Sequence, residues 1–384
     1  MYSLYAEQSD AMDECLQHII NFHSGKSRDQ VLIFSANAGA GKTYTANVTS
    51  KVLSQFGYSG TAIAFTGKAV TQLSKSGIPA QTFHSLMYKP ILDSDGECIG
   101  FDKKPRSEVL DAAGSYILLD ESSMIPFSMY NDLLAIGLPV IAIGDEAQLP
   151  PIDREHPDFN VMEIDDVPRI TLLTNRRTDP ECVGITKLSN SLRDSNGVPR
   201  RSGNGLKMVR KSSVMNVQFF RENEFDGVIV GTNKTRKSVT SMIRNAKGID
   251  SPLPTIGEPI MCLRNGFVDG RSIANGEVFT VEAVFDKGSA SVFSVRSVDN
   301  PDKILNVKVL NEFWETEKMP RMSKEVAMKY QQFTFGYAAT CWKWQGSSLN
   351  RVLFIDEDIS FFGDQQKFRY TAVSRAAKSL VYAF

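Results

Sequence analysis

The chain has 384 residues, of which 42% are hydrophobic and 23% are charged, and its net charge is −1 at pH 7. These values describe an ordinary globular protein that is long enough for two or three domains. A net charge close to zero excludes a global basic field, so a nucleic acid could bind only through local patches.

Neither membrane insertion nor export is indicated by the sequence. No apolar run approaches the roughly 20 residues needed to span a bilayer, and residues 1–7 lack the basic-then-apolar order of a signal peptide. The five cysteines are scattered and never spaced as CxxC. This spacing argues against a zinc site or a disulfide framework and fits reduced thiols in the cytoplasm.

The first half begins with an expected helix over residues 9–22. Buried-type strands at 31–35, 61–65, 116–119 and 140–144 then alternate with helical stretches. Short continuous apolar runs of this kind predict a parallel sheet covered on both faces, with ligands at the carboxyl ends of its strands.

A loop of small residues follows the first strand. Residues 36–43 read Ala-Asn-Ala-Gly-Ala-Gly-Lys-Thr, and a helix is expected from Thr43 to about Gln55. In such a loop the backbone N–H groups can point at phosphate oxygens, Lys42 can reach the β- and γ-phosphates, and the Thr43 hydroxyl can ligate Mg²⁺. Ala36 replaces the usual first glycine, and a plain turn before an ordinary helix is the alternative. The predicted cradle consists of Ala38, Gly39, Ala40 and Gly41.

Acidic and amide residues follow the third and fourth strands. Asp120 can hold the water shell of Mg²⁺, and Glu121 can activate an attacking water. In the run from Gly144 to Pro151, Gln148 is placed to sense a γ-phosphate. Together with the loop, these residues predict hydrolysis of a nucleoside triphosphate.

Two inserted segments have a different texture. Residues 89–107 are polar and contain a turn signal, so they could form a β-hairpin with Phe101 as its exposed aromatic, or a simple surface loop. In the second half, buried-type strands are expected at 228–231, 335–340, 352–355 and 380–384. Between them, short alternating β segments predict a small β-barrel-like insertion. The segments of this insertion are 259–263, 276–284, 290–295 and 304–310.

The order of motifs resembles that of superfamily 1 helicases. Lys42-Thr43, Thr66-Gly67-Lys68-Ala69, Asp120-Glu121 and Gly144-Asp145…Gln148 occur in the family's order. Three further segments are similar to the RecD/Dda-like branch, called superfamily 1B. These are Thr-Phe-His-Ser-Leu at 82–86, Tyr-Ala-Ala-Thr-Cys-Trp-Lys-Trp-Gln-Gly-Ser at 337–347 and Tyr-Thr-Ala-Val-Ser-Arg-Ala at 370–376.

This resemblance implies an α/β fold of two RecA-like domains with parallel sheets. The first domain would span 1–175 and carry a β-hairpin pin insertion at 88–108. The second would comprise 176–256 and 320–384, interrupted by a small SH3-like β-barrel at 257–319. The long tower of Dda-like relatives would be short or missing, because only some twenty residues separate Trp314 from the motif that begins at Tyr337.

The resemblance also implies an ATP site between the two domains. Gln8 would read the adenine, and Arg177 and Arg375 would serve as arginine fingers that stabilise charge on the transferring phosphoryl group. The expected catalytic residues are Lys42, Asp120, Glu121, Gln148, Arg177 and Arg375; the nucleotide contacts are Gln8, Ala38, Gly39, Ala40, Gly41, Lys42, Thr43 and Gly346; the Mg²⁺ ligands are Thr43 and Asp120.

Single-stranded DNA would cross the tops of both domains and be moved 5′→3′ as the cleft opens and closes. Trp342 and Trp344 depart from the family pattern, and they could either pack in the core or stack on a base. The expected DNA contacts are Thr66, Lys68, Thr82, His84, Phe101, Asn233, Lys234, Trp342, Lys343 and Ser347.

The resulting prediction is a monomeric, ATP- and Mg²⁺-dependent DNA helicase that acts on single strands and on junctions with duplex. Its setting would be DNA replication, recombination or repair in the cytoplasm of a bacterial or phage-infected cell, with single-strand-binding or other replication and recombination proteins as partners. Two alternatives stay open: a single-strand translocase that displaces proteins with little unwinding, and a non-catalytic DNA-binding subunit. A small-molecule kinase would leave the segments at 337–347 and 370–376 unexplained.

Overall fold

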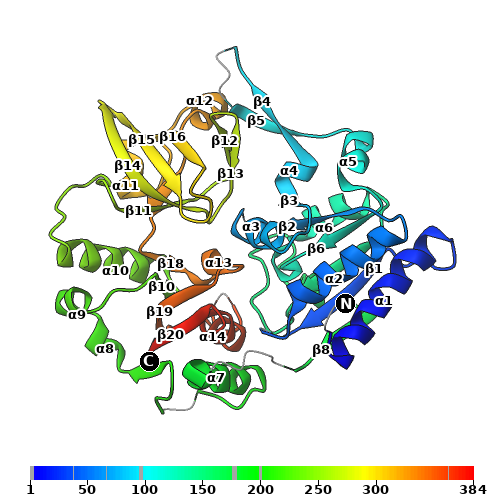
Figure 1. Cartoon of the computed structure of the whole chain (residues 1–384). Coiled ribbons are helices and arrows are strands. Elements are labelled where there is room, and N and C mark those ends of the chain that lie inside the picture. The colour runs from blue at the N-terminus through cyan, green and yellow to red at the C-terminus, as the bar shows by residue number, and fades with distance from the viewer. Residues whose placement is uncertain are drawn as a thin grey trace. The chain divides into compact units, whose positions relative to one another are not determined.

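The computed structural model describes residues 4–37, 39–65, 67–94, 98–174, 180–198, 201–361 and 363–384. The chain divides into two compact units (Figure 1). The first unit comprises residues 1–87 and 103–178, and the second comprises 88–102 and 179–384. In the described part of the chain, no helix combines the length and the apolar character that a bilayer crossing requires.

The first unit is built on a six-stranded parallel sheet with the strand order β3-β2-β6-β7-β1-β8. All residues of the inner strands β1, β6 and β7 are buried, as the continuous apolar runs predict. The prediction of a parallel sheet is therefore confirmed. The strands are β1 (Val31–Ala36), β2 (Gly60–Ala64), β3 (Ala80–Thr82), β6 (Tyr116–Leu119), β7 (Val140–Gly144) and β8 (Arg169–Leu172).

Helices cover this sheet. Side chains of α1, α2 and α3 share one buried cluster with alternate residues of the strands, and α1 lies beside α2 in Figure 1. The helices are α1 (Ala6–His23), α2 (Lys42–Gln55), α3 (Gly67–Lys75), α4 (Phe83–Met87), α5 (Arg106–Ala113) and α6 (Phe127–Leu134), with the 3₁₀ turns η1 (Ser122–Met124) and η2 (Val161–Glu163).

The second unit contains a five-stranded parallel sheet with the order β18-β10-β19-β20-β9. Helices α9 and α10 pack against one face, and the ring of Phe354 packs on Phe368 of α14 on the other. The strands are β9 (Leu206–Val209), β10 (Gly227–Val230), β18 (Ala338–Thr340), β19 (Leu349–Ile355) and β20 (Ala376–Ala383). The helices are α7 (Val183–Arg193), α8 (Lys211–Val214), α9 (Val217–Glu222), α10 (Asn233–Ala246), α13 (Cys341–Trp344) and α14 (Gln365–Val373), with the turn η3 (Pro180–Cys182).

The β insertion of the second unit is a five-stranded antiparallel sheet with the order β16-β15-β14-β11-β17. Its core is rich in aromatic side chains, among them Phe279, Phe293 and Trp314. The elements are β11 (Pro259–Cys262), β14 (Val278–Lys287), β15 (Ala290–Ser297), β16 (Ile304–Leu310) and β17 (Phe333–Phe335), with the hairpin β12 (Gly266–Val268)–β13 (Arg271–Ile273) and the helices α11 (Asn311–Thr316) and α12 (Lys324–Met328). The short helices α11 and α12 lie in the region before Tyr337 where the tower was expected to be short or missing.

The prediction of a single strand at 335–340 is wrong, because this segment belongs to two strands. β17 pairs with β11 in the antiparallel sheet, whereas β18 pairs with β10 in the parallel sheet. The chain crosses between the sheets at Gly336, whose N–H donates to the Pro259 carbonyl at 2.7 Å. A Cβ at Gly336 would lie 3.1 Å from the Cβ of Pro259, so this close crossing favours glycine.

The polar segment after residue 87 forms a β-hairpin rather than a plain loop. Its strands are β4 (Tyr88–Leu92) and β5 (Cys98–Lys103). At its tip, the Asp93 carboxylate forms an ion pair with the Lys329 ammonium at 2.6 Å. Lys329 directly follows α12. Phe101 is half-buried, so the expectation of an exposed aromatic is wrong.

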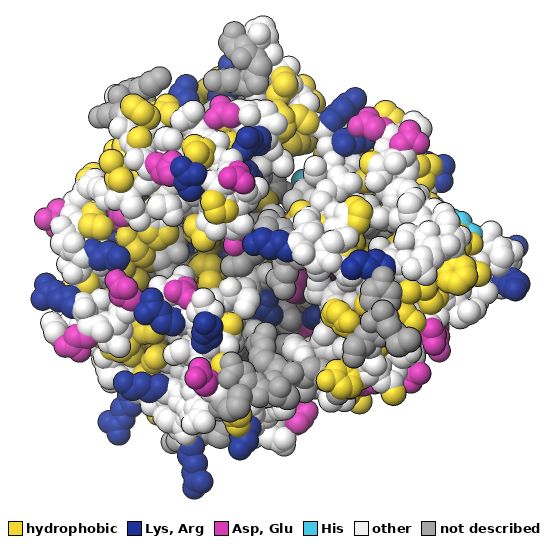
Figure 2. Space-filling view, in the orientation of Figure 1, with side chains coloured by type: hydrophobic (Ala, Val, Ile, Leu, Met, Phe, Trp, Pro, Cys, Tyr) yellow, Lys and Arg dark blue, Asp and Glu magenta, His cyan; other side chains and the backbone are white. Residues whose placement is uncertain are grey.

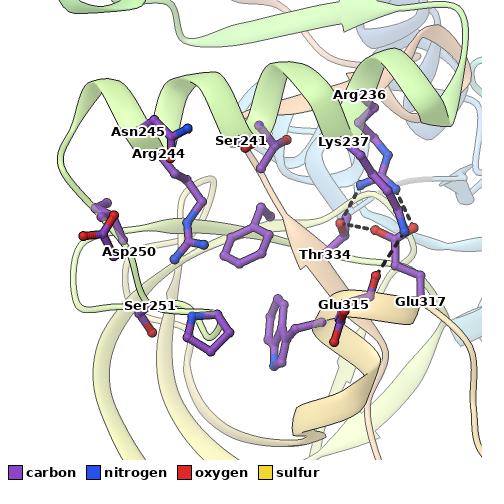
Figure 3. A pocket seen from close by; sticks show the side chains of 15 residues that line it. Arg236, Lys237, Ser241, Arg244, Asn245, Asp250, Ser251, Glu315, Glu317 and Thr334 are labelled. Carbon is purple, nitrogen blue, oxygen red and sulfur yellow. Dashed lines mark hydrogen bonds and ion pairs between the residues drawn. The ribbon is translucent and has the colours of Figure 1, made fainter. Parts of the chain in front are cut away.

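Buried ion pairs join α10 to the β insertion. The Arg236 guanidinium donates to the carboxylate of Glu317 and, at 2.6 Å, to the Thr334 hydroxyl (Figure 3). Arg244, two turns further along α10, makes a bidentate pair with Glu258 at 2.8 and 3.1 Å. A pocket of about 380 Å³ lies between these two pairs. Burial alone would raise the pKa of Glu317, but the hydrogen bond and charge of Arg236 lower it. We infer that the α10 arginines fix the antiparallel sheet to the parallel one.

Replacing Arg236 with Met should destabilise the second unit strongly, because Glu317 would keep a buried charge without its partner. Removing one member of a buried pair costs about 3–5 kcal/mol. All three tryptophans of the chain lie in the second unit, so their fluorescence during urea unfolding reports on this unit. In the matched control Arg296→Met, the lost partner is Glu282 and both side chains are over a third exposed (40% and 34%). That loss should cost less than about 1 kcal/mol. Equal midpoints for the two variants would contradict the role assigned to Arg236.

Candidate functional site

The loop between β1 and α2 leaves a helix N-terminus without a cap. Gly39 and Gly41 have φ values of 82° and 91°, which favour glycine, and they turn the chain so that α2 begins at Lys42. Gly41, the N-cap, offers no side-chain acceptor, and the first turn carries no acidic residue. The first N–H groups of this 14-residue helix are therefore available to an anion. Ala38 lies outside the described residues.

Gln8 supports this loop from α1. Its buried side chain donates from Nε2 to the Ala40 carbonyl at 3.1 Å, and its Oε1 accepts from the Tyr5 N–H. A Cβ at Gly41 would lie only 2.5 Å from the Gln8 Nε2, so Gln8 and the glycine fit each other closely. In the structure the amide of Gln8 holds the phosphate loop, and its contact with adenine stays a prediction.

Asp120 and Glu121 follow β6 at the same edge of the sheet. The Glu121 N–H donates to the Asp120 carboxylate at 3.0 Å, and Glu121 itself has a φ of 51°, a strained conformation for a residue with a side chain. Burial, reinforced by the charge of Glu121, raises the pKa of Asp120 to about 6. The positive charge of Lys42 acts in the opposite direction and lowers the pKa of Asp120.

Several buried polar atoms near this edge have no hydrogen-bond partner among the residues that the structure describes. They are Glu121 Oε2, Ser123 Oγ and Gln148 Oε1, and Asn37 Oδ1 follows the neighbouring strand β1. Because buried polar atoms are normally paired, these atoms call for a ligand or water. An acidic pair beside a lysine and an uncapped helix suits a phosphate with a divalent cation: Thr43 and Asp120 would hold the cation, and Lys42 would hold the phosphate.

The turn after β7 explains the run Gly144-Asp145…Gln148. The Asp145 side chain accepts from the Ala147 N–H at 3.1 Å, and its carbonyl accepts from the Gln148 N–H, so Asp145 shapes the turn that presents Gln148. A Cβ at Gly144 would lie 2.6 Å from the Met162 sulfur and 3.0 Å from the Ser122 hydroxyl, so a larger residue would require these side chains to shift.

Two of the predicted DNA contacts in the first unit also have local roles. The Thr82 hydroxyl accepts from the Ser85 N–H at 3.1 Å and caps α4. Burial lowers the pKa of His84, whose ring meets those of Phe65 and Phe83 edge-on, so this imidazole is neutral at pH 7. Lys68 lies in α3, and Thr66 and Arg177 fall outside the described residues.

In the second unit, the first turn of α10 presents Asn233 and Lys234 to solvent. The Asn233 side chain accepts from Arg236 Nε at 3.0 Å, and the Thr232 hydroxyl caps the helix by accepting from the Thr235 N–H. This turn follows β10, at the carboxyl edge of its sheet.

The two tryptophans of α13 differ in their surroundings. Trp344 is buried and donates from Nε1 to the Val228 carbonyl at 3.3 Å, so it packs in the core. Trp342 is half-buried beside Gly363, and base stacking by Trp342 stays a prediction. Burial lowers the pKa of Lys343, whose Nζ donates to Asn275 at 2.9 Å.

Arg375 directly precedes β20. It therefore lies at the amino edge of the parallel sheet of the second unit, opposite the carboxyl edge at which α10 begins. Its guanidinium is buried and donates to the Thr371 carbonyl, the Ser347 carbonyl and the Ser374 hydroxyl. Gly346, which precedes Ser347, has a φ of 70°. These contacts hold the predicted arginine finger within its own unit.

Sequence reasoning missed a second acidic pair, Asp356-Glu357. It follows the apolar strand β19 as Asp120-Glu121 follows β6. The rule of acids at strand ends, applied to the second half, would have found it.

The comparisons with known proteins agree with this geometry. A family model described as an AAA domain matches residues 4–206. The chain belongs to this AAA-domain family. No curated protein sequence matches the chain significantly.

Solved structures of Pif1 helicases, which belong to superfamily 1B, have the same fold. A structure of two coordinating Pif1 helicases at forked dsDNA is 18% identical, with a TM-score of 0.60, over 100% of this chain and 92% of that chain. Bacteroides Pif1 bound to ssDNA is 16% identical, with a TM-score of 0.60, over 100% and 93%. Bacteroides Pif1 with ADP-AlF3 and ssDNA is 17% identical, with a TM-score of 0.58, over 100% and 92%. The expected fold class of two RecA-like domains with parallel sheets is therefore confirmed.

Replacing Asp120 with Asn should stabilise the nucleotide-free protein at pH 8. A folded-state pKa near 6, against 3.8, means that ionising this carboxyl opposes folding. The penalty is fully present above pH 6, amounts to about 3 kcal/mol, and disappears as the pH falls from 6 toward 4. The gain in Tm of Asp120→Asn should therefore shrink between pH 8 and pH 5 in thermal unfolding followed by circular dichroism.

The matched control for this experiment is Asp132→Asn, which breaks a surface pair with Lys103. Its effect on Tm should be small at both pH values. A loss of Tm for Asp120→Asn at pH 8 would contradict the raised pKa.

Proposed function

We propose that the chain is an ATP- and Mg²⁺-dependent DNA helicase that translocates 5′→3′ on single-stranded DNA. The observation that supports this most is the uncapped N-terminus of α2, which begins at Lys42, a residue whose charge acts on the half-buried acid Asp120. Among the described residues, Glu121 Oε2 and Gln148 Oε1 near this acid have no hydrogen-bond partner. Further support is the fold shared with Pif1 helicases, which have been solved with ssDNA, with ADP-AlF3 and at forked dsDNA.

In the proposed reaction, the N–H groups of residues 39–43 and the Lys42 ammonium bind the β- and γ-phosphates. Bound Mg²⁺ would supply charge neutralisation on the phosphate oxygens. Asp120 and Thr43 hold it, and Glu121 orients the attacking water and accepts its proton.

Hydrolysis and movement depend on residues of both domains. Gln148 senses the γ-phosphate, and Arg177 and Arg375 stabilise the charge that develops on it. The proposed domains are 1–175, with the 88–108 hairpin, and 176–256 with 320–384, interrupted by 257–319. Cycles of closing and opening would move DNA across both domains. The proposed DNA contacts are Thr66, Lys68, Thr82, His84, Phe101, Asn233, Lys234, Trp342, Lys343 and Ser347.

The charge distribution is compatible with such local contacts. On the face drawn in Figure 2, described Lys and Arg side chains alternate with Asp and Glu. A protein that binds DNA through local contacts fits this face better than one that coats duplex DNA. We further propose a monomeric enzyme of DNA replication, recombination or repair in the cytoplasm that acts on single strands and junctions.

A second candidate is a single-strand translocase that displaces proteins but unwinds little. It would use the same ATP site. The half-buried Phe101 favours it, because a separating pin needs an aromatic side chain that reaches the junction.

Replacing Lys42 with Ala should abolish ATP hydrolysis stimulated by oligo-dT. A preorganised cation at the phosphates is worth roughly 10²–10³ in kcat. Lys51→Ala is the matched control, because Lys51 is an exposed lysine on the same helix and should leave the rate unchanged. Absence of ATPase activity in the wild type would favour a non-catalytic DNA-binding subunit instead.

Duplexes with a 5′ or a 3′ single-stranded tail test the direction and the pin together. Unwinding is expected only from the 5′ tail. Phe101→Ala should reduce it about tenfold or more, the loss expected for one aromatic stack on a base. Leu92→Ala, an exposed residue of the same hairpin, is the control.

Unwinding only from the 3′ tail would overturn the proposed direction. Full unwinding by Phe101→Ala would remove the pin assignment. If the wild type hydrolyses ATP on single strands without unwinding either duplex, the translocase is correct.

A further inference from the structure

Two neighbouring acidic side chains follow β19 and take no part in the mechanism described so far. The side chains of Asp356 and Glu357 are only 8% and 9% exposed. Buried carboxylates are costly unless they are hydrogen-bonded. Their partners therefore indicate which parts of the second unit they hold.

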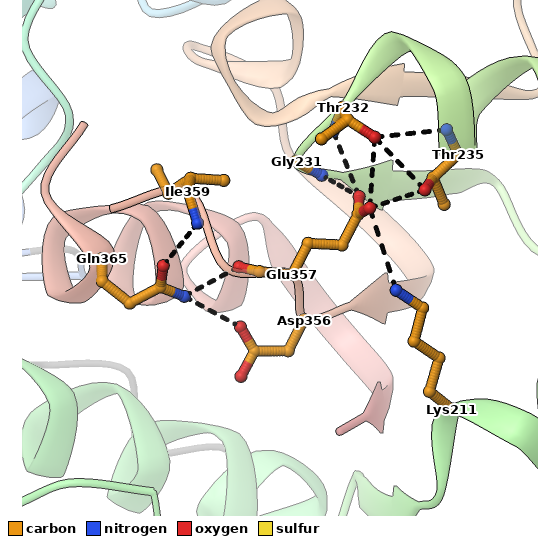
Figure 4. A network of polar contacts seen from close by, with 8 residues as sticks. All are labelled: Lys211, Gly231, Thr232, Thr235, Asp356, Glu357, Ile359 and Gln365. Atoms are coloured by element: carbon orange, nitrogen blue, oxygen red, sulfur yellow. Dashed lines mark hydrogen bonds and ion pairs between the residues drawn. The ribbon is translucent and has the colours of Figure 1, made fainter. Parts of the chain in front are cut away.

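The Glu357 carboxylate lies at the N-terminus of α10 (Figure 4). It accepts from the N–H groups of Gly231 and Thr232 at 2.7 and 3.1 Å, and from the hydroxyls of Thr232 and Thr235 at 3.1 and 2.5 Å. The Lys211 ammonium lies 3.8 Å away. A negative charge with several donors at a helix N-terminus is a stabilising arrangement, so Glu357 determines where α10 begins.

This arrangement is the counterpart of the loop before α2. Both helices follow a buried parallel strand, but the N-terminus of α2 is uncapped, whereas that of α10 carries an internal carboxylate. The Glu357 carboxylate therefore offsets part of the positive charge at the start of α10. It also fixes the position of the first turn, which carries Asn233 and Lys234.

The Asp356 carboxylate binds α14 instead. It accepts from Arg369 Nε at 2.8 and 3.1 Å, from the Tyr382 hydroxyl at 2.7 Å and from Gln365 Nε2 at 3.2 Å. Gln365 and Arg369 are one turn apart on α14, so both point at the same carboxylate. Gln365 Nε2 also donates to the Glu357 carbonyl at 2.9 Å, which joins the two acids to the start of α14.

The elements held by this pair carry the residues proposed for DNA and for ATP. The first turn of α10 presents Asn233 and Lys234 to solvent. Helix α14 runs from its contact with Asp356 to Val373, and Arg375 follows two residues later. A displacement of either helix end must therefore move residues 356–357 or break their hydrogen bonds.

We propose that Asp356 and Glu357 are positioning residues that transmit DNA engagement at α10 to Arg375 through α14. Glu357 sets the first turn of α10, and Asp356 sets the helix that leads to Arg375. This inference rests on the proposed function, because it assumes that Asn233 and Lys234 contact DNA and that Arg375 acts on ATP.

The test uses the full chain with Glu357→Gln and Asp356→Asn. Each amide keeps the size of the side chain but turns one acceptor oxygen into a donor that faces other donors. Asp226→Asn is the matched control, because Asp226 accepts from the Arg351 N–H at 2.9 Å at the opposite edge of the same sheet. Thr235→Val, which removes one hydroxyl and keeps the carboxylate, replaces Glu357→Gln if that variant does not fold.

Four quantities are measured: the Kd for oligo-dT, KM and kcat for ATP with and without saturating oligo-dT, and Tm. Glu357→Gln should raise the Kd for DNA about tenfold, as expected for the loss of hydrogen bonds to a charged group. At saturating DNA it should still lose most of the DNA stimulation of kcat. Asp356→Asn should lower the stimulated kcat about tenfold, with the Kd for DNA unchanged within about twofold. Asp226→Asn should change none of these.

The proposed coupling through α14 is wrong if, at saturating DNA, the DNA stimulation of kcat in Glu357→Gln equals that of the wild type. It is also wrong if, in all three variants, kcat and Tm fall while the Kd for DNA rises to a similar extent, because that pattern describes a general loss of structure. Failure of the proposed function gives a different result, in which the wild type itself has no DNA-stimulated ATPase activity.

Discussion

The first unit depends on a helix end that the protein leaves unsatisfied. The N–H groups at the start of α2 have no cap, and no acidic residue of the first turn offsets the helix dipole. The glycines at positive φ, the amide of Gln8 behind the loop and the buried strand β1 all serve to hold this end in place. Because the sheet is parallel, the ends of β6 and β7 bring their acidic and amide residues to the same edge.

Three features at the carboxyl edge of the first sheet are unfavourable for the stability of the fold. Partial burial raises the pKa of Asp120, Glu121 occupies a strained backbone conformation, and the Gln148 amide oxygen has no hydrogen-bond partner among the described residues. Each feature is unfavourable for stability, as is common at functional sites. The second unit differs, because a carboxylate of the chain itself, that of Glu357, accepts from the N–H groups of Gly231 and Thr232 directly before α10.

The parallel sheets and the β insertion could be predicted because their strands are continuous or alternating apolar runs. The division of 335–340 into two strands could not, because it depends on the close approach of Gly336 to Pro259, which are distant in sequence. The same limit applies to Trp344, whose partner is the Val228 carbonyl, and to Phe101, whose partial burial depends on the folded surroundings of the hairpin. For the site, strand-end acids were readable wherever the rule was applied, and Asp356-Glu357 was missed only because it was not applied there. The pairing of Gln8 with the phosphate loop needed the fold.

The strand order of the second unit has a consequence for how the protein folds. β20 lies between β19 and β9, so β9 has no strand partner until residues 376–383 have been synthesised. The ion pair at the tip of the 88–102 hairpin likewise forms only after Lys329 has been synthesised. The first sheet, in contrast, is complete once β8 has been made. During synthesis the first unit can therefore assemble early, while the second stays an open chain with unpaired strands and belongs to the slow, long-range class of folding reactions.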